Sequence, residues 1–204
     1  ETGLEKITLL SHSMGSYLAY AYLKKHPGKV KKLVLVAPVL PTGHNQDRAG
    51  VKTAQKRFVE FARSNEKQEI KEEGLDKDNL TDREKTARWR IGFASGNIYH
   101  IERWRQMPGG QAFFNGDVAG LINKNTHDGL MDNLMGTLRK YRIPIYVIIG
   151  DHDLVDFGLA SWPSVAGKIP HMKLTKLEDA GHNSWIDQPG EFEKALGKIL
   201  HGRE

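Results

Sequence analysis

The 204-residue sequence contains no cysteine and no long apolar run. The absence of cysteine excludes disulfide bonds, a thiol nucleophile and zinc sites built on cysteine. No stretch has the pattern of a signal peptide or the length of a membrane-spanning helix, although a signal upstream of the printed start would not be visible. We therefore expect a protein of the reducing cytoplasm by default, with no membrane partner.

Composition and charge are those of a globular domain. Hydrophobic residues make up 39% and charged residues 27% of the chain, whose formal net charge is +5. The basic residues at 24–32 flank the end of a predicted helix, where cations suit the helix dipole, and this favours a solvated face over nucleic-acid binding. The sequence has no His-Glu-x-x-His motif and no paired carboxylates, so we expect no metal and no cofactor.

One short stretch near the start carries the first chemical signal. The apolar run at 7–11 breaks into Ser-His-Ser-Met-Gly, and small and apolar residues at helical spacing follow to residue 25. This order predicts a strand, a sharp turn and a helix over 14–25, with Ser13 at the apex of the turn. Such a turn strains the backbone and needs small neighbours two positions away, here Ser11 and Gly15. The alternative is a serine that only caps the helix.

Further apolar runs predict the remaining strands. The runs at 33–37 and 144–150 are apolar on both faces, as central parallel strands are, and the run at 172–177 alternates like an edge strand. A weak helix over about 157–167 and a closing helix at 191–200 complete the pattern. The sequence therefore predicts an α/β fold with a mostly parallel sheet and flanking helices.

A long interval between two of these strands differs in composition. It is charge-rich and helix-prone over 46–90, where Thr81 and Glu84 have the spacing of a capping box, and aromatic residues follow. A helical insertion of this length predicts a cap over the carboxyl ends of the strands, where open α/β sheets bind ligands. The predicted organisation is a core domain at 1–40, a helical cap at 41–138 and a second core segment at 139–204.

Two sets of cap side chains have open roles. The large aromatic residues are expected to pack inside the cap more than to line a pocket; they are Trp89, Tyr99, Trp104, Phe113 and Phe114. The arginines either clamp a carboxylate or phosphate or form a solvated face; they are Arg88, Arg90, Arg103 and Arg105.

A serine nucleophile needs a base within hydrogen-bond reach and a third group to orient that base. In α/β proteins such groups follow the carboxyl ends of strands. The residues found there are Asp151, His152, Asp153 and Asp156 after one strand and His182 after the next. His152 is expected to be an ordinary loop histidine, and His12 to point into the sheet edge or against the first turn of the helix.

With these residues in place, the sequence resembles the α/β-hydrolase superfamily along essentially its whole length outside the cap. The order Ser, Asp, His is the order of that superfamily, the acid falls in its Gly-x-x-Asp turn at 150–153, and the base falls in its Gly-His signature at 181–182. The resemblance implies that Ser13 is the nucleophile, that His182 is the general base and then acid, and that Asp153 orients the imidazole.

The resemblance also leaves alternatives. Asp151 and Asp156 are rival acids. The amide of Met14 would be one oxyanion donor, and the other would come from a loop after the third strand of the fold, which precedes the printed sequence.

Within the superfamily, the cap and the segment 179–192 resemble the proline iminopeptidase-like and epoxide-hydrolase-like branch. Epoxide hydrolases and haloalkane dehalogenases use an aspartate nucleophile, which Ser13 does not match. Iminopeptidases carry a Trp-Glu pair in the cap, whereas this cap has Trp89-Arg90 and Trp104-Arg105. An esterase, lipase or amidase acting on a small-molecule, peptide or acyl substrate is therefore an equal expectation. The alternative is a hydrolase-fold binding or interaction protein with little turnover.

The chain begins without methionine, and the predicted nucleophile strand follows within a few residues. The resemblance therefore implies an N-terminally truncated chain, the C-terminal half of the hydrolase fold. On that interpretation the isolated 204 residues would expose one apolar strand edge, lack one oxyanion donor and be inactive.

Overall fold

A computed structural model of the chain describes residues 5–41, 48–107, 120–121, 124, 133–153 and 161–202. In the long helix that begins at residue 48, side chains are described from residue 56 onward. The rival acid Asp156 and the aromatic residues Phe113 and Phe114 lie outside the described residues, as does the first part of the predicted helix at 157–167.

Four parallel strands form one sheet in the order β1 (Ile7–His12), β2 (Val30–Val36), β3 (Ile145–Gly150) and β4 (Met172–Leu177). The two runs that are apolar on both faces are the central strands β2 and β3, and the alternating run is the edge strand β4, as predicted. Strand β1 forms the other edge of the described sheet, where Leu10 is 53% exposed.

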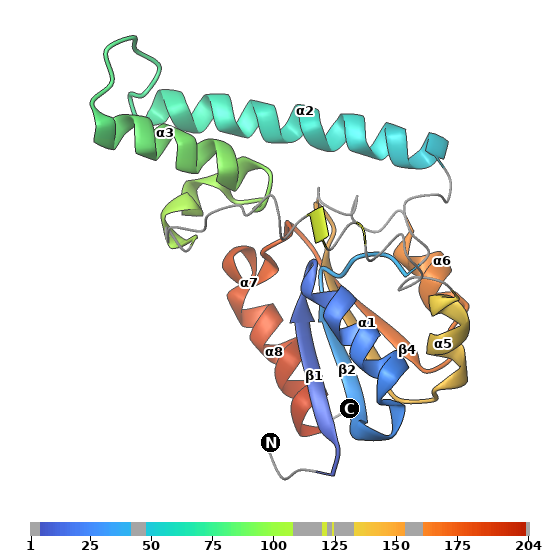
Figure 1. Cartoon of the computed structure of the whole chain (residues 1–204). Coiled ribbons are helices and arrows are strands. Elements are labelled where there is room, and N and C mark those ends of the chain that lie inside the picture. Colours follow the sequence, from blue (N-terminus) through green and yellow to red (C-terminus); the bar gives the residue numbers. More distant parts are fainter. Residues whose placement is uncertain are drawn as a thin grey trace.

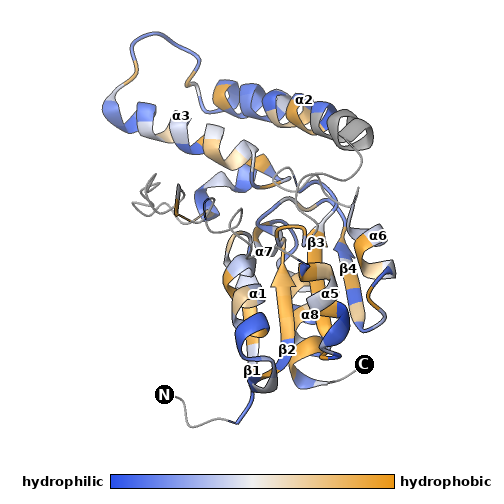
Figure 2. Cartoon of the chain, turned by 45° about the vertical axis from the view of Figure 1, so that its right-hand side comes forward, coloured by the Kyte–Doolittle hydropathy of each residue, from blue (hydrophilic) through white to orange (hydrophobic). Residues whose placement is uncertain are grey.

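Alternation along the central strands builds two cores. Leu33 and Leu35 of β2 pack with helices α1 (Gly15–Lys25), α5 (Leu134–Lys140) and α6 (Trp162–Gly167) on one face of the sheet. Val34 packs on the opposite face, against helix α8 (Pro189–His201). Figure 1 shows α1 in front of the sheet and α8 behind it, and in Figure 2 the strands are the most continuously hydrophobic part of the chain. A single-turn 3₁₀ helix, η1 (Pro27–Lys29), joins α1 to β2.

The segment predicted to form a cap, for which we keep the name cap, contains the described helices α2 (Arg48–Glu72) and α3 (Asp82–Ser95) and the 3₁₀ helix η2 (Ile101–Gln106). Helices α2 and α3 lie beyond the ends toward which the strands point (Figure 1). The predicted capping box is confirmed, because Thr81 Oγ1 accepts from the Glu84 N–H at 3.3 Å and the Glu84 carboxylate accepts from the Thr81 N–H at 2.7 Å. The cap also has its own small core, built around Ile91 and Trp104.

Three features differ from the sequence-based expectations or add to them. Helix α5 was not predicted, and its Leu134 and Leu138 pack in the core on the sheet. Trp89 was expected in the cap interior, but it is 65% exposed, and among the described aromatic rings it stacks on Phe93, one turn further along α3. A short helix, α7 (Ser184–Asp187), precedes the closing helix and was not predicted. Among the described helices, none combines the length and apolar character needed to cross a bilayer.

Candidate active site

The turn between β1 and α1 has the strain that the sequence predicts. Ser13 has a φ of 52°, in the left-handed region, where a residue with a Cβ costs roughly 1–2 kcal/mol. The turn is held because the Ser13 N–H donates to the Val36 carbonyl at 3.0 Å, and the Ser13 carbonyl accepts from the Ser16 N–H at 2.9 Å. A Cβ built on Gly15 would lie 3.7 Å from the Ser11 Cβ, an ordinary contact, so serine at position 11 fits beside the helix.

The Met14 amide precedes the first turn of α1. No hydrogen bond within the described residues uses this N–H, and the Met14 side chain is 41% exposed. An N–H at a helix start carries partial positive charge and can stabilise an anion.

Asp153 and His182 meet in the interior. The Asp153 carboxylate is fully buried and His182 is 4% exposed, and His182 Nδ1 lies 3.0 and 3.1 Å from the two carboxylate oxygens. A carboxylate only accepts, so we assign the ring proton to Nδ1. That tautomer leaves Nε2 with a free lone pair, the form in which a histidine acts as a base.

The rival acid Asp151 faces elsewhere. Its Oδ1 lies 2.8 Å from His152 Nδ1 and 3.3 Å from the Ala180 N, which donates to it. Of the two described aspartates of this loop, only Asp153 contacts His182.

Ser13 and His182 are neighbours through His12. The His12 ring lies 4.6 Å from the His182 ring and 4.8 Å from the Trp185 ring, centroid to centroid. His12 Nε2 is 3.3 Å from the His182 carbonyl oxygen, to which it donates. The described residues show no hydrogen bond between Ser13 and His182 themselves. The contact of His12 with His182 was not expected, since the sequence favoured a position of His12 in the sheet edge or against the helix.

Burial and neighbouring charge shift the pKa of His12. Removal from water lowers its pKa below the ordinary 6.5, and the charge of His182 lowers the pKa further. The hydrogen bond to the His182 carbonyl and the Asp153 charge oppose this shift more weakly. His12 is therefore favoured as the neutral donor that its contact requires.

His152 joins the core to the cap. Its ring lies 4.5 Å from the ring of Tyr99, 5.3 Å from Phe61 and 5.7 Å from Phe58. Burial, followed by the charge of Asp179, raises the pKa of Tyr99. Within the part of the chain that the structure describes, no three side chains of metal-binding type come together.

Three of the four cap arginines have structural partners. Arg103 Nη1 donates to the carbonyls of Ile186 and Asp187 at 2.9 and 2.6 Å, and Arg105 forms a bidentate pair with Glu73. Arg90 donates to the Met107 carbonyl at 3.2 Å. These contacts fit a packing role better than a substrate clamp.

Two cavities lie away from the turn at Ser13. One, of about 590 Å³, lies in the cap beside Trp104, and the other, of about 430 Å³, lies between β4 and α8. Neither is lined by Ser13, Asp153 or His182.

A strained serine turn at the end of a parallel strand and a buried Asp–His pair after later strands are features of the α/β-hydrolase fold. The profile of the α/β-hydrolase fold family matches residues 1–189, and the chain belongs to this family. The fold, together with hydrolases among its relatives, supports a hydrolase.

Individual relatives are distant. The chain is 25% identical over 205 residues to the AB hydrolase superfamily protein YclE of Bacillus subtilis, covering 97% of this chain and 69% of the relative. It is 26% identical over 211 residues to the (lyso)-N-acylphosphatidylethanolamine lipase of Mus musculus, covering 98% and 60%. An α/β-fold family hydrolase from Bacillus anthracis str. Sterne shares the fold at a TM-score of 0.59 and 16% identity, covering 96% of this chain and 67% of that structure.

The chain spans 58–69% of the length of the curated relatives that it matches along nearly its whole length.

Proposed function

We propose that this chain carries the nucleophile, base and acid of a serine hydrolase that cleaves an ester or amide bond through an acyl-enzyme. The observation that carries the proposal is the buried Asp153–His182 pair, whose proton placement leaves a free lone pair on His182 Nε2. His182 and Ser13, which is held in a strained turn, both follow the carboxyl ends of strands in the same parallel sheet. A protein that only binds a ligand has no physical need for this combination.

The reaction runs in two halves. Ser13 Oγ attacks the substrate carbonyl carbon while His182 Nε2 takes the hydroxyl proton, and the negative charge on the carbonyl oxygen is stabilised by the Met14 N–H. The tetrahedral intermediate collapses when His182 returns that proton to the leaving alkoxide or amine. Water then attacks the acyl-enzyme with His182 again as base, and the acid product leaves with Ser13 restored. Asp153 holds the ring and stabilises its charged form throughout.

We propose an acyl ester as the substrate class. The support is the lipase named among the relatives, which acts on N-acylphosphatidylethanolamine and its lyso form. Arg90, Arg103 and Arg105 of the cap contact other residues of the chain, so these three arginines are less available to bind a small anionic substrate.

The test uses the full-length natural protein and p-nitrophenyl esters of increasing acyl length. Ser13→Ala and His182→Ala should each lower kcat by roughly 10⁴ or more, and the double variant should be little worse than either, because triad members act as a unit. Losses that multiply in the double variant would contradict the proposal. Tight ligand binding without turnover in the unmodified protein would favour the binding-protein alternative.

A further inference from the structure

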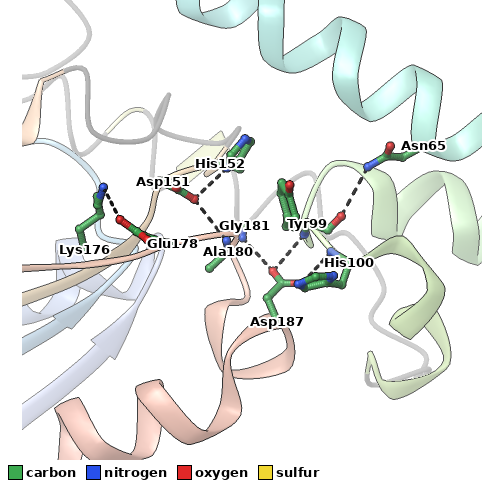
Figure 3. Close-up of polar contacts among 10 residues, drawn as sticks. All are labelled: Asn65, Tyr99, His100, Asp151, His152, Lys176, Glu178, Ala180, Gly181 and Asp187. Carbon is green, nitrogen blue, oxygen red and sulfur yellow. Dashed lines mark hydrogen bonds and ion pairs between the residues drawn. The ribbon is translucent and has the colours of Figure 1, made fainter.

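A second buried carboxylate lies next to the proposed base and takes no part in the reaction described above. Asp187 ends α7 and is 1% exposed. Its Oδ2 accepts from the Gly181 N–H at 2.8 Å and the Tyr99 N–H at 3.0 Å, and its Oδ1 accepts from the His100 N–H at 2.9 Å (Figure 3). Three main-chain amides therefore hold one buried negative charge.

These amides belong to two different parts of the fold. Gly181 immediately precedes His182 on the loop after β4, whereas Tyr99 and His100 lead into η2 of the cap. The Asp187 carboxylate thus bridges the loop of the base and the cap, which are more than 80 residues apart in sequence.

Further contacts close the same junction. The Asn183 N–H donates to the Asn97 carbonyl at 2.9 Å. A Cβ built on Gly181 would lie 2.9 Å from the Asn97 oxygen and 3.0 Å from the Ile98 Cα, so the two backbones touch. Arg103 of η2 also donates to the Asp187 carbonyl, at 2.6 Å. The residues on either side of His182 are therefore both tied to the cap.

We propose that Asp187 is a positioning residue for His182 and that it fixes the base and the η2 end of the cap as one unit. The proposal rests on the proposed function for its kinetic consequence. Asp187 accepts from the Gly181 N–H, which belongs to the peptide between Ala180 and Gly181, so it holds the backbone one residue before His182 and thereby limits where the His182 ring can lie.

The test is Asp187→Asn in the full-length protein. An amide has one accepting oxygen and turns an NH₂ toward the remaining donors, so at least one of the three N–H groups loses its partner. We expect kcat to fall about 10- to 100-fold, the size of effect that a misplacement of about 1 Å produces, with KM for a short p-nitrophenyl ester changed less than about threefold.

The pH profile separates positioning from general loosening. The groups that face His182 are Asp153 at Nδ1 and His12 against its ring. When the hold on Gly181 is lost, the bond to Asp153 weakens, and the acid limb of kcat/KM moves to lower pH because the imidazolium is less stabilised. The control is Ile91→Val in the buried core of the cap, which removes one methyl group and leaves every hydrogen bond of the junction in place. In Ile91→Val, the acid limb of kcat/KM should stay at the same pH as in the unmodified protein.

A readout that needs no turnover keeps this proposal separate from the proposed function. The His182 Nδ1 proton, identified in proton NMR spectra by its loss in His182→Ala, should exchange with water at least about tenfold faster in Asp187→Asn than in Ile91→Val. The deciding comparison is one in which Asp187→Asn has the same melting temperature as Ile91→Val. If its exchange rate, its kcat and the acid limb of its pH profile then equal those of the unmodified protein, Asp187 has only a structural role and the proposal is wrong.

A second variant guards against misfolding of the first. Arg103→Gln removes the contact from the cap side and leaves the carboxylate in place. It should accelerate the same proton exchange, and adding it to Asp187→Asn should have little further effect, because both act through one junction. If the effects of Arg103→Gln and Asp187→Asn on the exchange rate are fully independent, the two residues do not act through one junction and the proposal is wrong.

Discussion

Gly150 is the position at which a single added methyl group tests the geometry of the site. It ends β3, and a Cβ built there would overlap the Ala180 carbonyl oxygen and would lie 2.5 Å from both the Ala180 carbonyl carbon and the Gly181 oxygen. All three are backbone atoms of the loop that carries His182. The loop must therefore retreat by about 1 Å before an ordinary contact is reached.

We expect Gly150→Ala to cost roughly 3 kcal/mol of unfolding free energy, the upper end for overpacking, because no flexible side chain can yield. A displacement of this size at the base should also lower kcat about 100-fold. The control is Gly197→Ala in α8, where a Cβ meets nothing within 4 Å; it should keep full activity and gain up to about 1 kcal/mol. Urea denaturation and ester hydrolysis give both quantities. Wild-type stability and turnover in Gly150→Ala would refute the close approach of β3 to this loop.

Two further predictions concern the neighbours of His182. Asp153→Asn should lower kcat by roughly 10²–10⁴ while Asp151→Asn has a much milder effect, since only the group on His182 Nδ1 sets the tautomer; steady-state kinetics with equal losses in both variants would rule out this assignment. The lowered pKa of His12 means that its contribution to stability is complete above about pH 6.5 and is lost as the pH falls through that lowered pKa, because the unfolded chain binds the proton more readily. His12→Gln should flatten the pH dependence of the unfolding free energy below pH 6.5, and an unchanged slope would contradict the burial of a neutral His12.

Local sequence signals were sufficient where the cause is local. Alternation and doubly apolar runs predict the four strands, because side-chain direction repeats every two residues. The capping box at Thr81 predicts the start of α3, since the N-terminal amides need nearby acceptors. The strain at Ser13 follows from a turn that must reverse direction within a few residues.

Long-range contacts gave no comparable signal. In the sequence, Asp187 is a charged residue two positions before Pro189, and nothing local connects it with residues 99 and 100. Only the folded chain brings the Tyr99 and His100 amides to its carboxylate. The contact of His12 with His182 likewise joins residues 170 positions apart. The placement of α5 on the sheet and the exposure of Trp89 depend on which surface each helix meets, and composition does not specify that surface.

The central claim is that Ser13 is a nucleophile activated by His182. The most direct measurement is intact-mass analysis and peptide mapping of the full-length protein after reaction with a fluorophosphonate, which bonds to an activated serine and loses fluoride. We predict one adduct, located on Ser13, absent in Ser13→Ala and formed at least about 10³-fold more slowly in His182→Ala. An unmodified protein, or an adduct on another residue, would contradict the account.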